Sequence, residues 1–273
     1  MITHLKSKLF IMTKNLIIVL LSALLLLSCR EKPVEAGEVQ LKFTHSVDLE
    51  PIKLNLPIYE NAAGNQYQVN EIKYFISQVA FIKEDGQVIK LKEQDQIHYC
   101  DLNYENTLTW QLPKIEEGRY KAITFVFGLD EVDNISNRFV NPPETNFSWS
   151  QVLGGGYHYL QINGKWLSPQ GELRNMNFHT GIGQLYKNNV ITVDSIYAFI
   201  HNYFTVNLPC NFSVNKKTIT ILTLDMNVQQ WFENPVIYDH NYFGSGIMQN
   251  QEAQSVIKEN GKTVFSAKSE VVI

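Results

Sequence analysis

The stretch EVQLKFTH, residues 38–45, decides the fold of this chain. Its apolar side chains Val39, Leu41 and Phe43 alternate with polar ones, and His45 continues the apolar face. A period of two indicates a half-buried β-strand, because successive side chains point to opposite faces of a sheet. The stretch therefore predicts a strand that places one face, including His45, against a hydrophobic core.

Similar patterns recur along the chain, separated by turn residues such as Glu84-Asp85-Gly86. They predict further strands over residues 69–83, 87–91, 119–129, 157–163, 175–179, 189–208 and 217–228. Residues 248–258 predict a short helix, and the structure of 264–273 is left open. Helical patterns do not alternate with the strands, which argues against an α/β fold. We therefore predict an all-β protein, a single Greek-key-like β-sandwich with long loops and a short C-terminal helix.

The N-terminus has the features of a lipoprotein signal. Three lysines precede an apolar run of 12 residues, 16–27, which ends in Leu-Leu-Ser before Cys29. A transmembrane helix needs about 20 apolar residues, so the run is too short for that alternative. We predict a signal peptide at 1–28, lipidation of Cys29, a tether at 29–37 and one domain at 38–273. The lipid would anchor the domain to the outer membrane, facing the periplasm or the cell surface.

Charge and cysteine content restrict the function further. After removal of residues 1–28, the chain has 20 basic and 27 acidic side chains, which gives a net charge of −7. That balance argues against nucleic-acid binding, which favours a basic surface. With Cys29 lipidated, Cys100 and Cys210 remain, and an oxidising compartment would allow a disulfide between them. Two free buried cysteines are the alternative, and the sequence does not decide between them.

The common catalytic motifs are absent from the sequence. It has no Gly-x-Ser-x-Gly elbow, no phosphate-binding loop and no His-Glu-x-x-His pair. Cys210 has no neighbouring His and Met cluster of the kind found in blue-copper sites. We therefore expect that the protein is not an enzyme.

Three histidines have unusual settings. His45 and His158 lie on apolar strand faces, and His179 follows Phe178 at a predicted strand end. A neutral imidazole binds copper or zinc well, and a dry site with few ligands would favour Cu(I). The alternative for each is a core histidine bonded to a carbonyl group.

Other polar groups suggest simpler roles. His98 and His240 look like ordinary surface or loop histidines, and His201 lies among aromatic residues. The oxygens of a polar loop could bind Ca²⁺ or could form Asx turns; they belong to Asp130, Asp133, Asn134 and Asn137.

Several motifs occur in the order seen in a known family. They are Phe43-Thr44-His45, Tyr59-Glu60-Asn61 with Gly64, Tyr74-Phe75-Ile76-Ser77 with Asp85-Gly86, Phe127-Gly128-Leu129-Asp130, Trp149 with Gly155-Gly156-Tyr157-His158-Tyr159, Phe178-His179-Thr180-Gly181, and Trp231-Phe232 with Pro235. Over nearly the whole predicted mature chain, the sequence resembles the MbnP-like copper-binding family. The family includes the methanobactin-associated periplasmic protein and copper-repressed surface proteins, and the lipobox resembles its Bacteroidota-type lipoprotein members.

The resemblance implies an envelope protein that binds copper through histidines, for acquisition, storage or delivery. His45 and His179 match the family's two histidine motifs, and His158 is a candidate third ligand. Relatives oxidise a tryptophan two residues before the first histidine, where this chain has Phe43. The resemblance also implies a dihaem cytochrome c peroxidase-like partner, and an outer-membrane receptor is a further candidate.

A metal-free alternative follows from the aromatic content. The loops around Trp149 and Trp166 look exposed in the sequence, and exposed aromatic rings bind glycans or partner proteins well. A surface binding module without a metal is therefore the second functional hypothesis.

Overall fold

Strand β1 (Ala36–Val47) contains the stretch whose alternation predicted the fold. Val39, Leu41 and Phe43 are buried, whereas Lys42 between them is exposed. The strand begins at Ala36, inside the predicted tether. The computed structural model describes residues 35–92 and 96–272, so the predicted signal peptide and Cys29 lie outside the described residues.

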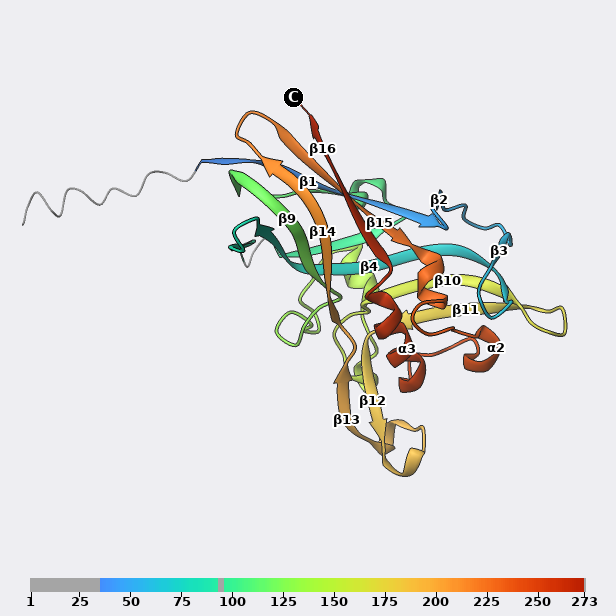
Figure 1. Cartoon of the computed structure of the whole chain (residues 1–273). Coiled ribbons are helices and arrows are strands. Elements are labelled where there is room, and N and C mark those ends of the chain that lie inside the picture. Colours follow the sequence, from blue (N-terminus) through green and yellow to red (C-terminus); the bar gives the residue numbers. More distant parts are fainter. Residues whose placement is uncertain (1–34, 93–95, 273) are drawn as a thin grey trace, which may run out of the picture. The chain divides into compact units, whose positions relative to one another are not determined.

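The first sheet is built around β1. Its strand order is β16-β15-β1-β2, with β7 and β8 also paired to β1. These strands are β2 (Glu50–Pro51), β7 (Thr109–Gln111), β8 (Ile115–Glu116), β15 (Ile219–Asn227) and β16 (Phe265–Val272). β1 and β15 run parallel, and their register places His45 opposite Met226. Strands from the two ends of the domain therefore lie side by side (Figure 1).

The second sheet carries the functional residues discussed below. Its order is β11-β10-β4-β9-β14, and β3, β5 and β6 also pair with β4. The strands are β3 (Tyr59–Glu60), β4 (Gln66–Lys83), β5 (Val88–Lys90), β6 (Ile97–Asp101), β9 (Gly118–Phe127), β10 (Leu160–Leu167), β11 (Leu173–Thr180) and β14 (Phe204–Val214). A separate hairpin consists of β12 (Ile182–Tyr186) and β13 (Ile196–His201).

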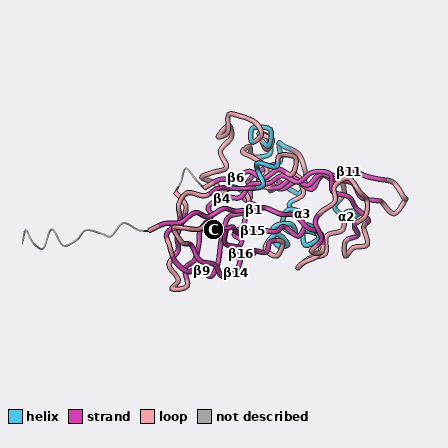
Figure 2. Tube along the Cα trace, turned by 90° about the horizontal axis from the view of Figure 1, so that it is seen from above, coloured by secondary structure: helices cyan, strands magenta, loops and turns pink. Residues whose placement is uncertain are grey.

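Two hydrophobic clusters lie on opposite faces of the second sheet. The inner core lies between the sheets and includes Phe43, Tyr74 and Phe178. Figure 2 shows the layers, with β4, β6 and β11 in one and β1, β15 and β16 in the next. The outer cluster packs under the loops that cover the other face; it consists of Phe75, Tyr99, Leu129, Phe147, Trp149, Leu153, Tyr157, Tyr159 and Ile182. The predicted β-sandwich is confirmed, with its core between two sheets.

The C-terminal part differs in detail from the prediction. The helix is α3 (Gln251–Gly261), which begins after Asn250, whose side chain accepts a hydrogen bond from the Ala253 amide. Met248 therefore lies before the helix, and a shorter helix, α2 (His240–Phe243), precedes it. The open C-terminal segment forms β16, an edge strand whose mostly exposed, polar side chains hide its strand character in the sequence.

The long strand predicted over 189–208 is two strands in different sheets. β13 ends at His201 and β14 begins at Phe204. Between them the side chain of Asn202 is buried and donates a hydrogen bond to the carbonyl oxygen of Gly181, at 3.0 Å. That side-chain bond competes with a regular ladder and marks the change of sheet.

Of the two alternatives for the cysteines, the disulfide is not formed: Cys100 and Cys210 are free thiols, the first buried and the second partly buried. Cys100 pairs with Tyr74 of β4, whereas Cys210 lies near Ala122, which pairs with Ile82 of the same strand. Eight residues of β4 separate those two levels, which is roughly 25 Å at the usual rise of a strand. A disulfide needs Cα atoms within about 7 Å, so the sheet register excludes it.

In the described part of the chain, no helix has the length and apolar character needed to cross a membrane.

Candidate metal site

His158 and His179 are brought together on the outer face of the second sheet. Their ring centroids are 5.2 Å apart and the rings meet edge to face. His179 follows Phe178 of the inner core, so strand alternation turns its side chain to the opposite face. His158 lies just before β10, the strand that pairs with β11, and its ring contacts Phe147 and Trp149 of the outer cluster.

A backbone carbonyl fixes the proton of His158. Its Nδ1 lies 3.1 Å from the carbonyl oxygen of Phe147, and its own backbone amide donates to the same oxygen at 2.9 Å. A carbonyl oxygen can only accept, so Nδ1 carries the proton and Nε2 keeps a free lone pair. A fixed tautomer of this kind is the usual preparation of a histidine for metal binding.

A side-chain relay fixes the proton of His179. The side-chain amide of Asn163 donates to Glu71 Oε2 at 2.8 Å, which requires its nitrogen to face the carboxylate. Its oxygen then faces His179 Nε2, at 2.8 Å. Nε2 therefore donates, and Nδ1 of His179 keeps the lone pair. Lys73, on the same strand as Glu71, forms an ion pair with the Glu71 carboxylate.

Both imidazoles are neutral at physiological pH. Burial lowers the pKa of His158 to about 4, with a smaller opposing effect from the carbonyl groups of Phe147 and Ser148. Burial also lowers the pKa of His179 to about 3, reinforced by His158 and by the charge of Lys73. Both residues are partly buried, and His179 lines a pocket of about 290 Å³. The pair offers two neutral nitrogen ligands.

The close packing of Trp149 explains why a glycine, Gly181, follows the Phe-His-Thr segment. A Cβ atom at this position would lie 2.7 Å from the indole ring of Trp149. Glycine thus lets Trp149 pack against the end of β11, where its ring centroid is 4.7 Å from that of His158. The indole nitrogen donates to the carbonyl oxygen of Leu153 at 3.2 Å, which holds the ring in place.

His45 does not join this pair, which corrects the predicted three-histidine site. Its Nε2 lies 3.1 Å from the hydroxyl of Tyr74, in the inner core. The second sheet therefore separates His45 from His158 and His179. Among residues 35–92 and 96–272, no three His, Cys, Asp or Glu side chains form a group that could hold a metal. The sequence placed His45 correctly on an apolar face but could not show which face His179 uses.

The family model described as MbnP matches residues 36–249. This chain belongs to the MbnP family. Among solved structures, MbnP from Methylosinus trichosporium is similar to it at 16% identity, with a TM-score of 0.49; the alignment covers 75% of this chain and 80% of that one. A comparison with curated proteins gave no match.

Two histidines of this MbnP-family chain are more buried than the sequence suggested. His98 stacks between Phe43 and Trp110, with ring centroids 5.2 and 4.8 Å away. His240 is 1% exposed and is surrounded by Trp166, Phe232 and Tyr238. The rings that cover His98 come from strands distant in sequence, and the polar neighbours Asp239 and Asn241 conceal the burial of His240.

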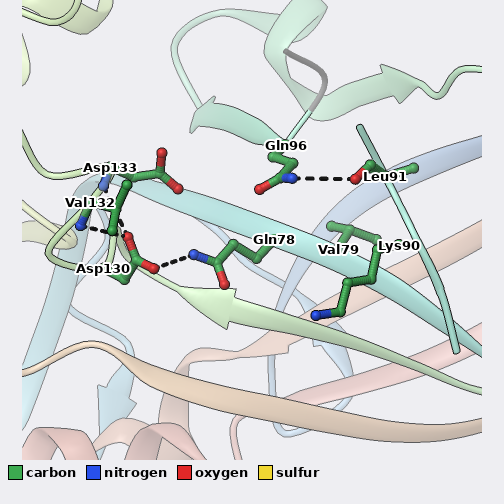
Figure 3. Close-up of a pocket in the computed structure, with 8 residues that line it drawn as sticks. All are labelled: Gln78, Val79, Lys90, Leu91, Gln96, Asp130, Val132 and Asp133. Carbon is green, nitrogen blue, oxygen red and sulfur yellow. Dashed lines mark hydrogen bonds between the residues drawn. The ribbon is translucent and has the colours of Figure 1, made fainter. Parts of the chain in front are cut away.

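The polar loop after β9 in this MbnP chain is engaged internally, not arranged as a calcium site. Asp130 Oδ1 accepts hydrogen bonds from the amides of Val132 and Asp133, at 3.0 and 2.9 Å. Its other oxygen accepts from Gln78, as Figure 3 shows within a pocket of about 360 Å³. Asp133 pairs with Arg138 at 3.1 Å. These are the Asx turns of the alternative prediction.

The tryptophans of the metal-free hypothesis are also buried. Trp149 and Trp166 are each 1% exposed, so neither presents a ring to a glycan. Trp166 donates to Asn241 Oδ1 at 3.0 Å, which satisfies its indole nitrogen inside the domain. The prediction that these two tryptophans of the MbnP-family protein are exposed is therefore wrong.

Proposed function

We propose that this protein binds copper as Cu(I) through His158 Nε2 and His179 Nδ1. One observation carries the proposal: two neutral imidazoles are in ring contact, and hydrogen bonds occupy the opposite nitrogen of each. Membership of the MbnP family adds weight, because copper is what the sequence resemblance implied.

Several features of the pair favour a monovalent soft ion. Imidazole nitrogens suit copper and zinc, whereas Ca²⁺ and Mg²⁺ require oxygen ligands. Two neutral ligands leave the charge of a divalent ion uncompensated, and this cost is smaller for a monovalent ion such as Cu(I).

The cellular role proposed with this site is copper acquisition, storage or delivery in the cell envelope. Lipid on Cys29 would hold the domain at the outer membrane, and a bound Cu(I) would be held for transfer. The proposed role is binding of the metal, not catalysis. A dihaem peroxidase-like protein or an outer-membrane receptor remains the proposed partner.

Metal retention after loading tests the proposal. Residues 31–273, which contain both sheets and both clusters, would be loaded with Cu(I) under reducing conditions, desalted and measured by mass spectrometry. We expect about one copper per chain, and none after His158→Ala with His179→Ala. His201→Ala, a partly buried histidine outside the pair, is the matched control and should retain copper. Equal copper in the double variant would sink the proposal.

A further inference from the structure

A methionine lies beside His179 through a pairing distant in sequence. An isolated parallel bridge joins Asn177 of β11 to Gly246, and the Asn177 amide donates to the Ser245 carbonyl oxygen at 3.0 Å. This bridge brings the segment that contains Met248 next to the end of β11 that contains His179. The two side chains line the same pocket, of about 290 Å³.

A buried glutamine holds the two segments in this position. Gln254 of α3 is fully buried, and its side-chain amide donates to the carbonyl oxygen of His179 at 2.7 Å. The same amide donates to the carbonyl oxygen of Ile247, the neighbour of Met248, at 3.1 Å. One side chain thus ties the backbone of a candidate ligand to that of the methionine.

Met248 also packs on the outer face of the second sheet. It is partly buried and packs against the outer cluster. Two residues of that cluster, Phe147 and Trp149, contact the ring of His158. Met248 therefore shares a pocket with His179 and a hydrophobic cluster with the rings around His158.

We propose that the thioether sulfur of Met248 is the third metal ligand, so that the site is a His₂Met centre selective for Cu(I) and Ag(I). This inference rests on the proposed function and adds the ligand that sets the selectivity. Thioether sulfur is a soft, neutral donor that binds monovalent copper and contributes little to Zn²⁺. Methionine is otherwise an adaptable filler of irregular gaps, a role that leucine of similar volume performs equally well.

The test distinguishes a methionine that binds the metal from one that only fills space. It uses Ag(I), which does not change oxidation state, as the probe. Residues 31–273 contain three methionines, and Met176 and Met226 are buried in the inner core. Labelling the methionine methyl groups with ¹³C therefore provides one reporter at the site and two internal controls. On adding one equivalent of Ag(I), we expect the Met248 signal to shift while those of Met176 and Met226 stay in place.

A matched pair of variants gives the second readout. Met248→Leu should weaken Ag(I) and Cu(I) binding at least about 10-fold, since even the loss of an outer partner of a metal ligand causes that much. Zn²⁺ binding should not change, and Met226→Leu should leave all three affinities as they were. Far-UV circular dichroism of each variant checks that the fold is retained.

The outcomes separate this inference from the proposed function. If Ag(I) binds in a way that depends on His158 and His179, yet the Met248 signal stays in place and the leucine variant binds equally tightly, the third ligand is wrong and the histidine site stands. If the unaltered chain retains neither Ag(I) nor Cu(I), the proposed function itself fails, and the methionine ligand with it.

Discussion

At the scale of single residues, the candidate site is defined by where two protons lie. His158 and His179 carry them on different nitrogens, because one faces a backbone carbonyl and the other faces the oxygen of Asn163. Each arrangement leaves one lone pair for a metal. Two histidines in contact can serve as a ligand pair only when other groups fix their protons. Here the carbonyl of Phe147 and the side chain of Asn163 do so.

Replacing Asn163 tests that relay. In Asn163→Ala, His179 loses the acceptor that fixes its tautomer, so we expect Cu(I) affinity to fall about 10- to 100-fold. Competition with a colorimetric Cu(I) chelator measures the affinity. Asn175→Ala, which removes an exposed asparagine on β11, the strand of His179, is the control and should bind normally. Unchanged affinity in Asn163→Ala would show that the hydrogen bond does not orient His179.

His240 makes the domain sensitive to acid. Burial lowers its pKa from 6.5 to about 4, and its Nε2 has no hydrogen-bond partner. Between these pH values the unfolded chain binds a proton that the folded chain does not, so stability falls as the pH drops from 6.5 towards 4. In His240→Phe, the loss of unfolding free energy between pH 7 and pH 4.5 should be smaller by about 2 kcal/mol.

Urea denaturation at the two pH values measures that difference. The other buried histidines remain, so the variant should keep part of its acid sensitivity. An identical pH dependence in the two proteins would mean that His240 is protonated in the folded state.

At the scale of elements, the alternation of strands and one bulge place the site. The register of β10 against β4 shifts between Asn163 and Gly164, directly at the residue that holds His179. A Cβ atom at Gly164 would lie 2.0 Å from the carbonyl oxygen of Gln68. The two strands approach so closely here that only glycine fits, and the bulge sets the position of the Asn163 side chain.

Gly164→Ala should therefore cost about 2–4 kcal/mol of unfolding free energy, because a backbone carbonyl cannot move aside as a side chain can. Chemical denaturation measures this loss. Gly246→Ala is the matched control: its Cβ would meet nothing within 4 Å, and we expect a change within about 0.5 kcal/mol. A near-neutral Gly164→Ala would indicate that the strands separate at the bulge without cost.

At the scale of the whole molecule, the second sheet separates two groups of buried and partly buried residues. It divides the inner core, with His45 and Cys100, from the outer face, with the histidine pair. The same register keeps Cys100 and Cys210 at different levels of the sheet. Stability then comes from the hydrophobic core between the sheets and from no covalent cross-link among the described residues.

The thiols give a direct check of this register. A thiol reagent should find two thiols per unfolded chain of residues 31–273, with or without prior reduction. A reductant should leave the urea midpoint unchanged, whereas a native disulfide would contribute about 2–4 kcal/mol. Fewer than two thiols without reduction, with a midpoint that falls on reduction, would contradict the sheet register.

The sequence predicted the sandwich well where alternation is strong. β1, β9 and β15 were anticipated from their alternation, and β4 from a continuous apolar stretch, because it is buried on both faces. β16 was left open because its side chains are mostly exposed, and the break at Asn202 was missed because a buried amide supplies it. Periodicity reports burial of side chains and carries no information about edges or single side-chain bonds.

From the sequence alone came most of the strands, the family resemblance and two residues of the candidate site, His158 and His179. Tertiary structure alone decided that these two meet while His45 stays in the inner core. It also decided that Met248, some 70 residues after His179, lines the same pocket as His179. Alternation along a strand shows that neighbouring side chains lie on opposite faces, but it does not show what packs against each face. The pairing of distant strands decides which residues lie on the same face as each histidine.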